Sequence, residues 1–216
     1  ESTFVAVLDG GGGHVWSRML DNAQFSDLAM GASGQVVLGG AFSGTIDLGL
    51  GPLTSASGGN GLVASFDSSG ATVFAESVGV DPMSGYAVAV GPAGEIVLGG
   101  ISYLPQGSET SVVAHKLAPN GETVWSLTLG SADYAAANSV AVDGAGNVVL
   151  AGLVRDGAVD FGCGPHHIPL DPAMSWAGDM LLAKLDADGQ CLWSKTFGGD
   201  GNQSAWGVAT SSSGNV

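Results

Sequence analysis

Short apolar segments alternate with turns rich in Gly, Asp and Ser along the whole chain, and the same segments recur in a fixed order. The most regular one reads GQVVLGG at 34–40, GEIVLGG at 94–100 and GNVVLAG at 146–152, and residues 214–216 begin a fourth copy. The copies start 60, 52 and 68 residues apart. Tandem spacing of this size indicates one supersecondary unit that is repeated along the chain.

Three other kinds of segment accompany each copy. They are an apolar run that ends in a turn, such as LVASFDSSG at 62–70, an aromatic segment, such as TVWSLTLG at 123–130, and a small-residue segment, such as SVAVDGAG at 139–146. Their enrichment in Val, Leu, Phe and Trp, between turn-forming residues, predicts β-strands. No segment has apolar residues at i, i+3, i+4 and i+7, so we expect almost no helix.

We therefore expect an all-β fold, a propeller-like array of four-stranded antiparallel blades with about 60 residues per repeat. The Gly-x-Val-Val-Leu segment is expected as the innermost strand of each blade, because its small residues let backbones approach closely. The aromatic residue of each unit is expected between neighbouring blades. The single repeat domain, 1–216, divides into strands of a first blade at 1–33, full blades at 34–93, 94–145 and 146–213, and the start of another at 214–216.

Nearly four blades leave three arrangements open. The chain forms a four-bladed ring with an open seam, half of a larger ring that a second copy completes, or part of a longer array. A chain that begins at Glu1 and stops inside a strand favours the last, since whole proteins avoid exposed strand edges. We expect an incomplete ring or a fragment.

The charge of the chain excludes two classes of partner. The sequence has 20 acidic and 5 basic residues, for a net charge of −15. A nucleic acid or an anionic membrane surface would repel such a chain. No run of apolar residues is long enough for a transmembrane helix. The expected partners are therefore proteins or glycans at the loop faces.

The two cysteines stand in the same repeat. Cys163 replaces Leu50 of the aligned phrase GTIDLGLGP, and Cys191 replaces Thr72. Because both replacements occur together and only here, we predict a disulfide, with free buried thiols as the alternative. A disulfide would indicate an oxidising compartment.

Candidate metal ligands are sparse. His166 and His167 lie in the longest loop, close to Cys163, and Asp186 and Asp188 resemble the start of a calcium loop. A polar loop tip and an ordinary turn are the favoured interpretations, because neither group has the full ligand spacing of a metal site.

The other candidates are aromatic residues and one histidine. Trp176 and Trp206 lie outside the aromatic strand position and are candidates for stacking on a sugar, against plain packing. His115 occupies a strand position that Ala6, Ala64 and Ala183 hold in the other repeats, and we expect it to be accommodated structurally.

These motifs resemble the bacterial beta-propeller repeat family called SBBP. The best matches are DMLLAKLDADGQCLWSKTFGG at 179–199 and GNVVLAGLVRDGAVDFGCG at 146–164. The chain departs from the pattern at Phe74, which replaces the Trp, at Ala118, which replaces an Asp, and in the second repeat, which lacks the Asp-Phe-Gly phrase. The resemblance implies a scaffold from a large secreted or surface protein, with no catalytic signature.

The functional expectation is a non-enzymatic scaffold or binding segment of a bacterial extracellular or cell-surface protein. No catalytic residue and no cofactor site is predicted, because no nucleophile, zinc-hydrolase or phosphate-loop motif is present. Two alternatives stay open. One is a propeller hydrolase or lyase, or a glycan-binding lectin, with an axial site. The other is a structural repeat that assembles through open blade edges.

Overall fold

The structure is a computed structural model that describes residues 2–55, 59–78, 83–103, 109–168 and 177–216. The described residues form 18 β-strands and no helix. Every strand pair is antiparallel, which confirms the expected all-β class with four-stranded antiparallel sheets. The described residues therefore include no helix that could cross a membrane.

Three four-stranded sheets share one strand order, in which the second strand in sequence lies between the first and the third. Sheet I is β3 (Ala23–Met30), β4 (Val36–Phe42), β7 (Asn60–Phe66) and β8 (Thr72–Val78). Sheet II is β9 (Met83–Val90), β10 (Ile96–Tyr103), β11 (Thr110–Leu117) and β12 (Thr123–Ala132). Sheet III is β13 (Tyr134–Val142), β14 (Val148–Arg155), β17 (Asp179–Leu185) and β18 (Cys191–Phe197).

A two-stranded sheet and two small hairpins complete the fold. The two-stranded sheet pairs β1 (Ser2–Leu8) with β2 (His14–Asp21). The hairpins are β5 (Thr45–Asp47) with β6 (Pro52–Thr54), and β15 (Gly157–Asp160) with β16 (Pro165–Ile168). Each hairpin extends the connection between the second and third strands of its sheet, where the sequence has the aligned phrases GTIDLGLGP and GAVDFGCGP.

The boundaries of the sheets are shifted by one strand relative to the expected units at 34–93, 94–145 and 146–213. Each sheet begins one strand earlier, at β3, β9 or β13, so the Gly-x-Val-Val-Leu strand is an interior strand of its sheet and not the innermost one. The interior position agrees with burial of the strand on both faces. Val36 and Leu38 pack into one core and Val37 into the next, and a continuous apolar run of this kind is typical of a fully buried strand.

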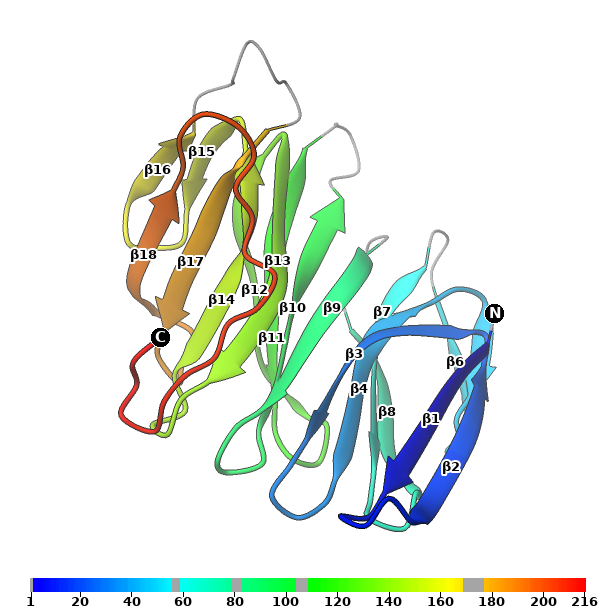
Figure 1. The fold of residues 1–216 in the computed structure, drawn as a ribbon. Helices are drawn as coiled ribbons and strands as arrows, with labels where there is room; N and C mark the ends of the chain where they lie inside the picture. The colour runs from blue at the N-terminus through cyan, green and yellow to red at the C-terminus, as the bar shows by residue number, and fades with distance from the viewer. Residues whose placement is uncertain (1, 56–58, 79–82, 104–108, 169–176) are drawn as a thin grey trace.

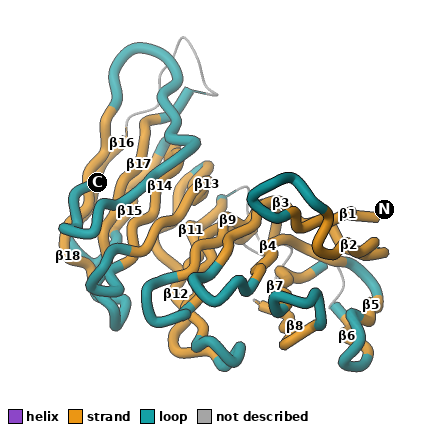
Figure 2. The backbone as a smooth tube through the Cα atoms, turned by 60° about the horizontal axis from the view of Figure 1, so that its bottom comes forward, coloured by secondary structure: helices purple, strands orange, loops and turns teal. Residues whose placement is uncertain are grey.

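The sheets stack face to face in chain order, from β1–β2 at one end to sheet III at the other (Figure 1). The chain termini lie at opposite ends of this row, and the turned view shows the same order (Figure 2). One apolar core fills each space between successive sheets, first between β1–β2 and sheet I, then between sheets I and II, then between sheets II and III. Each sheet is thus stabilised mainly by its neighbours.

An aromatic side chain from one sheet lies over a turn glycine of the next sheet at each of these interfaces. Trp16 lies over Gly70, and Phe74 over Gly121. Trp125 lies over Gly189 and donates a 3.1 Å hydrogen bond from Nε1 to the Ala187 carbonyl. A Cβ on any of these glycines would crowd the aromatic side chain, and each glycine has a positive φ that L residues rarely adopt. The expected place of the aromatic residues, between neighbouring sheets, is confirmed at these three positions.

Candidate functional site: a pocket where four equivalent turns meet

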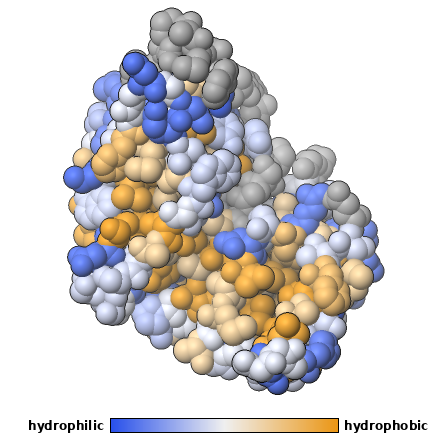
Figure 3. All heavy atoms as spheres, in the orientation of Figure 1, coloured by the Kyte–Doolittle hydropathy of each residue, from blue (hydrophilic) through white to orange (hydrophobic). Residues whose placement is uncertain are grey.

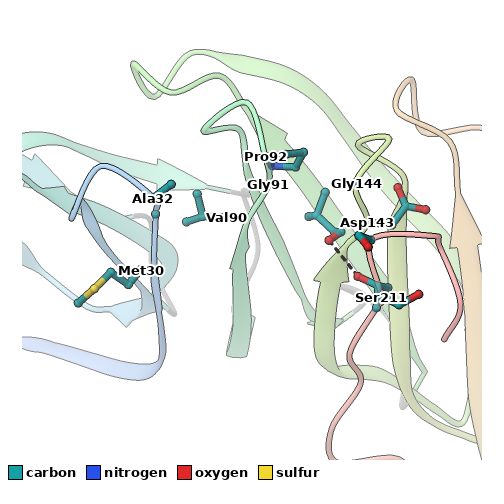
Figure 4. Close-up of a pocket in the computed structure, with 12 residues that line it drawn as sticks. Met30, Ala32, Val90, Gly91, Pro92, Asp143, Gly144 and Ser211 are labelled. Carbon is teal, nitrogen blue, oxygen red and sulfur yellow. Dashed lines mark hydrogen bonds between the residues drawn. The ribbon is translucent and has the colours of Figure 1, made fainter. Parts of the chain in front are cut away.

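A cavity of about 300 Å³ lies where four turns of the chain converge (Figure 4). Each turn contributes three consecutive residues, and the four triplets occupy the same position in the sequence repeat. The triplets are Met30-Gly31-Ala32, Val90-Gly91-Pro92, Val142-Asp143-Gly144 and Thr210-Ser211-Ser212. A single pocket is therefore built from one equivalent element of each repeat.

The turns that form the pocket share one local structure. In each turn, the amide of the middle residue of the triplet donates to the carbonyl of the residue four positions later, as in the 2.8 Å bond from Gly31 N to the Gln35 carbonyl. The residue three positions after that middle residue has a positive φ and is glycine in every copy, as at Gly34 and Gly146. A tight connection between antiparallel strands needs this left-handed residue, which explains why the sequence places Gly there.

Asp143 is the one ionisable residue among the described residues that line the pocket, and it is buried. Its Oδ1 accepts hydrogen bonds from the backbone amides of Ala145 (2.9 Å) and Asn147 (3.0 Å). Its Oδ2 accepts 2.9 Å from Asn147 Nδ2 and lies 2.8 Å from Lys184 Nζ. The carboxylate is thus fully occupied by its own turn and by a lysine of sheet III.

These contacts determine the protonation state of Asp143. Burial by itself would raise the pKa of this carboxyl. The hydrogen bonds from Lys184, Asn147 and Ala145 outweigh burial and lower the pKa of Asp143 well below its ordinary value of 3.8. A carboxylate that stays ionised and shares a buried cation is suited to holding structure, since a general acid or base needs a pKa near the working pH.

The lysine belongs to a second repeated position. Lys184 Nζ also donates 2.9 Å to the Gly214 carbonyl. The aligned residue of sheet II, Lys116, is buried as well and donates to the carbonyls of Gly146 (3.3 Å) and Ala187 (3.0 Å), both in turns of sheet III. In both cases a buried ammonium donates hydrogen bonds to backbone carbonyls in the following repeat.

The fourth wall of the pocket comes from residues 203–216, which form no strand but follow the face of sheet III. The Val208 amide donates 3.1 Å to Ser139 Oγ, and Thr210 Oγ1 donates 3.0 Å to the Val142 carbonyl. The first bond has an aligned counterpart between sheets I and II, where the Val88 amide donates 2.9 Å to Asp27 Oδ2. Residues 203–216 therefore occupy the place that the first strand of a further sheet would take.

The residues predicted as possible metal ligands form hydrogen bonds within a turn and to a neighbouring strand in this structure. Asp186 Oδ1 accepts from the amides of Asp188 (3.0 Å) and Gln190 (2.8 Å), so it caps the β17–β18 turn. His166 and His167 are neighbours on β16, where successive side chains point to opposite faces, and a His166 Nε2 to Ser194 Oγ contact of 2.7 Å ties the first to β18. Among the described residues, no group of three His, Cys, Asp or Glu side chains is placed to hold a metal ion.

The two cysteines singled out in the sequence are joined. A disulfide links Cys163, in the β15–β16 turn, to Cys191 at the start of β18, with a Cα–Cα distance of 5.6 Å. The bond ties the hairpin to the edge strand of sheet III. The hairpin turn is further held by Asp160 Oδ1, which accepts from the amides of Gly162 (2.7 Å) and Gly164 (3.0 Å). Asp47 caps the β5–β6 turn in the same way.

Trp206 and His115 are not among the residues that line the pocket. Trp206 is 80% exposed in the segment that follows sheet III, and Trp176 falls outside the described residues. His115 is buried on β11, and its Nδ1 lies 2.9 Å from Ser126 Oγ. Burial lowers the pKa of His115 from 6.5 to about 4, so the imidazole is neutral at physiological pH.

Sequence reasoning missed the Asp143–Lys184 pair. One signal was available, because Asp143 and Lys184 each stand at a repeat position that is uncharged in sheet I, where Gly31 and Ser65 take their places. The two replacements lie 41 positions apart, and only the packing of one turn on a neighbouring strand brings them within 2.8 Å.

Comparisons with known proteins give no family for this chain. No family model matches it, and no curated protein matches it. Among solved structures it is similar to the crystal structure of Sqt1 from Chaetomium thermophilum, with a TM-score of 0.31 and 16% identity. The match covers 81% of this chain and 49% of the other, so the chain spans about half the length of that structure. A similarity of this degree gives no information about function.

Proposed function

We propose that this chain is a non-enzymatic, propeller-like scaffold segment of a secreted or surface bacterial protein, and that it binds a protein or glycan at the face where the pocket opens. The convergence of four equivalent turns on one pocket carries the proposal. Equivalent elements of successive repeats meet at one place when the repeats are arranged around a common line, as blades of a propeller are.

The chemistry of the pocket supports binding over catalysis. The lining side chains are apolar or small, apart from the hydroxyls of Thr210, Ser211 and Ser212 and the carboxylate of Asp143. Asp143 is already paired with Lys184 and its own turn amides. A pocket with small polar groups on an apolar wall is suited to a short glycan or peptide segment.

The disulfide supports the proposed location. Cys163–Cys191 is exposed on its Cys163 side, and disulfides of this kind persist in oxidising compartments outside the cytosol. The resemblance to secreted bacterial repeats agrees with the same assignment.

A glycan and peptide array combined with a turnover assay tests the proposal. Ala32→Trp places a large side chain at the pocket wall, whereas Asn120→Trp adds the same side chain to an exposed turn outside the pocket. We expect Ala32→Trp to abolish array binding, Asn120→Trp to retain it, and no array ligand to be converted. Conversion of an array ligand that is lost in Ala32→Trp would show that the chain is an enzyme. Array binding that both variants retain would show that the ligand binds outside the pocket.

A further inference from the structure

Glycine follows asparagine at two places in the chain, and the two places differ in structure. Asn120-Gly121 lies in the turn between β11 and β12, whereas Asn60-Gly61 begins β7. The backbone nitrogen of the residue after an asparagine can attack the side-chain amide, and a glycine there has no side chain to hinder the attack. A pair of this kind is therefore a site at which a chain can modify itself without an enzyme.

The Asn120-Gly121 pair lies in a short, exposed turn. Asn120 Oδ1 accepts a 3.2 Å hydrogen bond from the Glu122 amide, and the Gly121 amide donates 2.9 Å to the Ala118 carbonyl. Hydrophilic and neutral residues lie mostly along the rim of the molecule in Figure 3, where Figure 1 has the turns. A turn with few backbone hydrogen bonds beside water opens at a low free-energy cost, so the Asn120 backbone can rotate while the sheets stay folded.

Asn60-Gly61 is the same dipeptide in a buried strand. Asn60 is 9% exposed, and its Nδ2 donates 2.8 Å to Ser77 Oγ. Because β7 is an interior strand of sheet I, Gly61 pairs with Ala41 on one side and with Val78 on the other. The attack requires rotation of the backbone between the two residues, and here that rotation would break the pairing with both neighbouring strands. Opening at this place therefore costs nearly as much as unfolding of the sheet.

Gly121 also belongs to a contact between two sheets. Phe74 of sheet I lies over Gly121, where an added Cβ would come within 2.8 Å of the ring. Phe74 is part of the core between sheets I and II. The φ of Gly121 is 93°, which the tight turn requires. A change in the length of this turn would therefore move Gly121 relative to the ring.

We propose that Asn120 deamidates in the folded chain and that Asn60 does not. The Gly121 nitrogen forms a bond to Asn120 Cγ, and the side-chain nitrogen leaves as ammonia together with the Gly121 amide proton. Water then opens the resulting succinimide at one of its two carbonyls. Attack at Cγ breaks the new bond and gives aspartate. Attack at the backbone carbonyl breaks the original peptide bond and gives isoaspartate, whose main chain runs through Cγ and is longer by one methylene group.

The two products have different effects on the fold. Sheet III has Asp188 at the aligned position, and Gly189 after it keeps its positive φ beneath Trp125. Aspartate therefore fits this turn. The longer main chain of isoaspartate displaces Gly121 from beneath Phe74 and weakens the contact between sheets I and II. The proposal goes beyond the binding function proposed above and does not depend on it.

Peptide mapping by mass spectrometry, after incubation of the full chain at mildly alkaline pH, tests the proposal. In the folded protein we expect the amide of Asn120 to be lost at least tenfold faster than the amide of Asn60. In concentrated urea the two rates should become similar, because the same dipeptide then reacts in an unfolded chain. If Asn120 in the folded protein loses its amide no faster than Asn60, the proposal is overturned.

Asn120→Ser is the matched control for the structural consequence. Sheet I has Ser69 at the aligned position, and Gly70 after it lies beneath Trp16 in the same kind of turn. Incubated wild-type protein is expected to contain isoaspartate and to unfold at a lower urea concentration than fresh protein, whereas incubation should not change the urea midpoint of Asn120→Ser. Fragmentation by electron transfer distinguishes isoaspartate from aspartate. Wild-type protein that carries isoaspartate at this position and keeps its urea midpoint overturns the inferred effect on the sheet contact.

Discussion

Glycine has two separate structural roles in this chain, which the backbone angle and the neighbouring atoms distinguish. Gly70, Gly121 and Gly189 combine a positive φ with space for an aromatic ring. Gly40 and Gly152 have ordinary backbone angles but face the main chain of the neighbouring strand, next to a β-bulge in that strand. The first role comes from turn geometry and the second from close backbone approach.

Replacing Gly152 with alanine tests the second role. The added methyl group would collide with the Ala136 carbonyl, so we expect Gly152→Ala to lower the free energy of unfolding by about 2 kcal/mol, as overpacking of a core does. Gly199→Ala is the control, because no atom lies near the position of its added Cβ. Urea denaturation measures both. Equal effects of the two substitutions would contradict a close approach at Gly152.

Asp143→Asn tests the buried ion pair. The amide keeps the shape of the side chain but leaves the Lys184 ammonium buried without its counter-ion, so we expect a loss of about 3 kcal/mol in unfolding free energy. Asp9→Asn is the matched control, since Asp9 caps its turn through the same amide positions in an exposed place. Its expected loss is about 1 kcal/mol or less. A loss at Asp143 no larger than at Asp9 would show that the pair contributes nothing beyond its turn.

His115 makes stability depend on pH. Its pKa is about 4 in the folded chain and 6.5 when exposed, so the unfolded chain binds the proton first as the pH falls. We expect stability to decrease between pH 6.5 and pH 4, by up to about 3 kcal/mol from this group. His115→Ala, which introduces the residue found at the aligned positions, should flatten that decrease in urea titrations. If the pH dependence of stability is the same in His115→Ala as in the wild-type protein, other groups cause it.

At the scale of elements, the hairpins are additions to a constant sheet. β15–β16 packs beside β12 of the preceding sheet and places Val159, Phe161 and Ile168 in the core between sheets II and III. Gly130 provides the room, since a Cβ there would meet Val159. The disulfide then ties the tip of the hairpin to β18. The hairpin is thus part of the interface between sheets and not a free loop.

Removing the disulfide tests how much it contributes. The bond closes a loop with a sequence separation of 28 residues, for which chain-entropy arguments give about 3.5 kcal/mol. We expect the Cys163→Ser, Cys191→Ser double variant to lose stability by that order, and a reducing agent to lower the melting temperature of the wild-type protein alone. Equal melting temperatures of the wild-type and variant proteins without the reducing agent would show that the bond adds no stability.

At the scale of the whole molecule, stability comes from contacts between neighbouring sheets under a strong net negative charge. The chain carries 20 acidic and 5 basic residues, and two ion pairs occur among the described residues. Most carboxylates therefore repel one another across the surface, which opposes the compact state.

Salt should stabilise this protein. Raising NaCl from about 0.01 M to about 1 M shortens the Debye length from about 30 Å to about 3 Å and screens the repulsion. We expect the urea midpoint of unfolding to rise with salt. The same series with Lys195→Glu, which adds negative charge at an exposed position, should show a steeper rise. A midpoint that falls with salt would indicate that attractive pairs dominate.

The repeat, the β class, the turn positions and the aromatic contacts between sheets could all be predicted from the amino-acid sequence. These features follow from local chemistry, because alternating apolar segments, Asx turns and left-handed glycines act over a few residues. The strand at which each sheet begins, the meeting of four turns at one pocket and the pairing of Asp143 with Lys184 could be seen only in the folded chain. A periodic sequence has no marked starting point, and only packing between sheets shows which neighbours a strand buries and which residues distant in sequence come into contact.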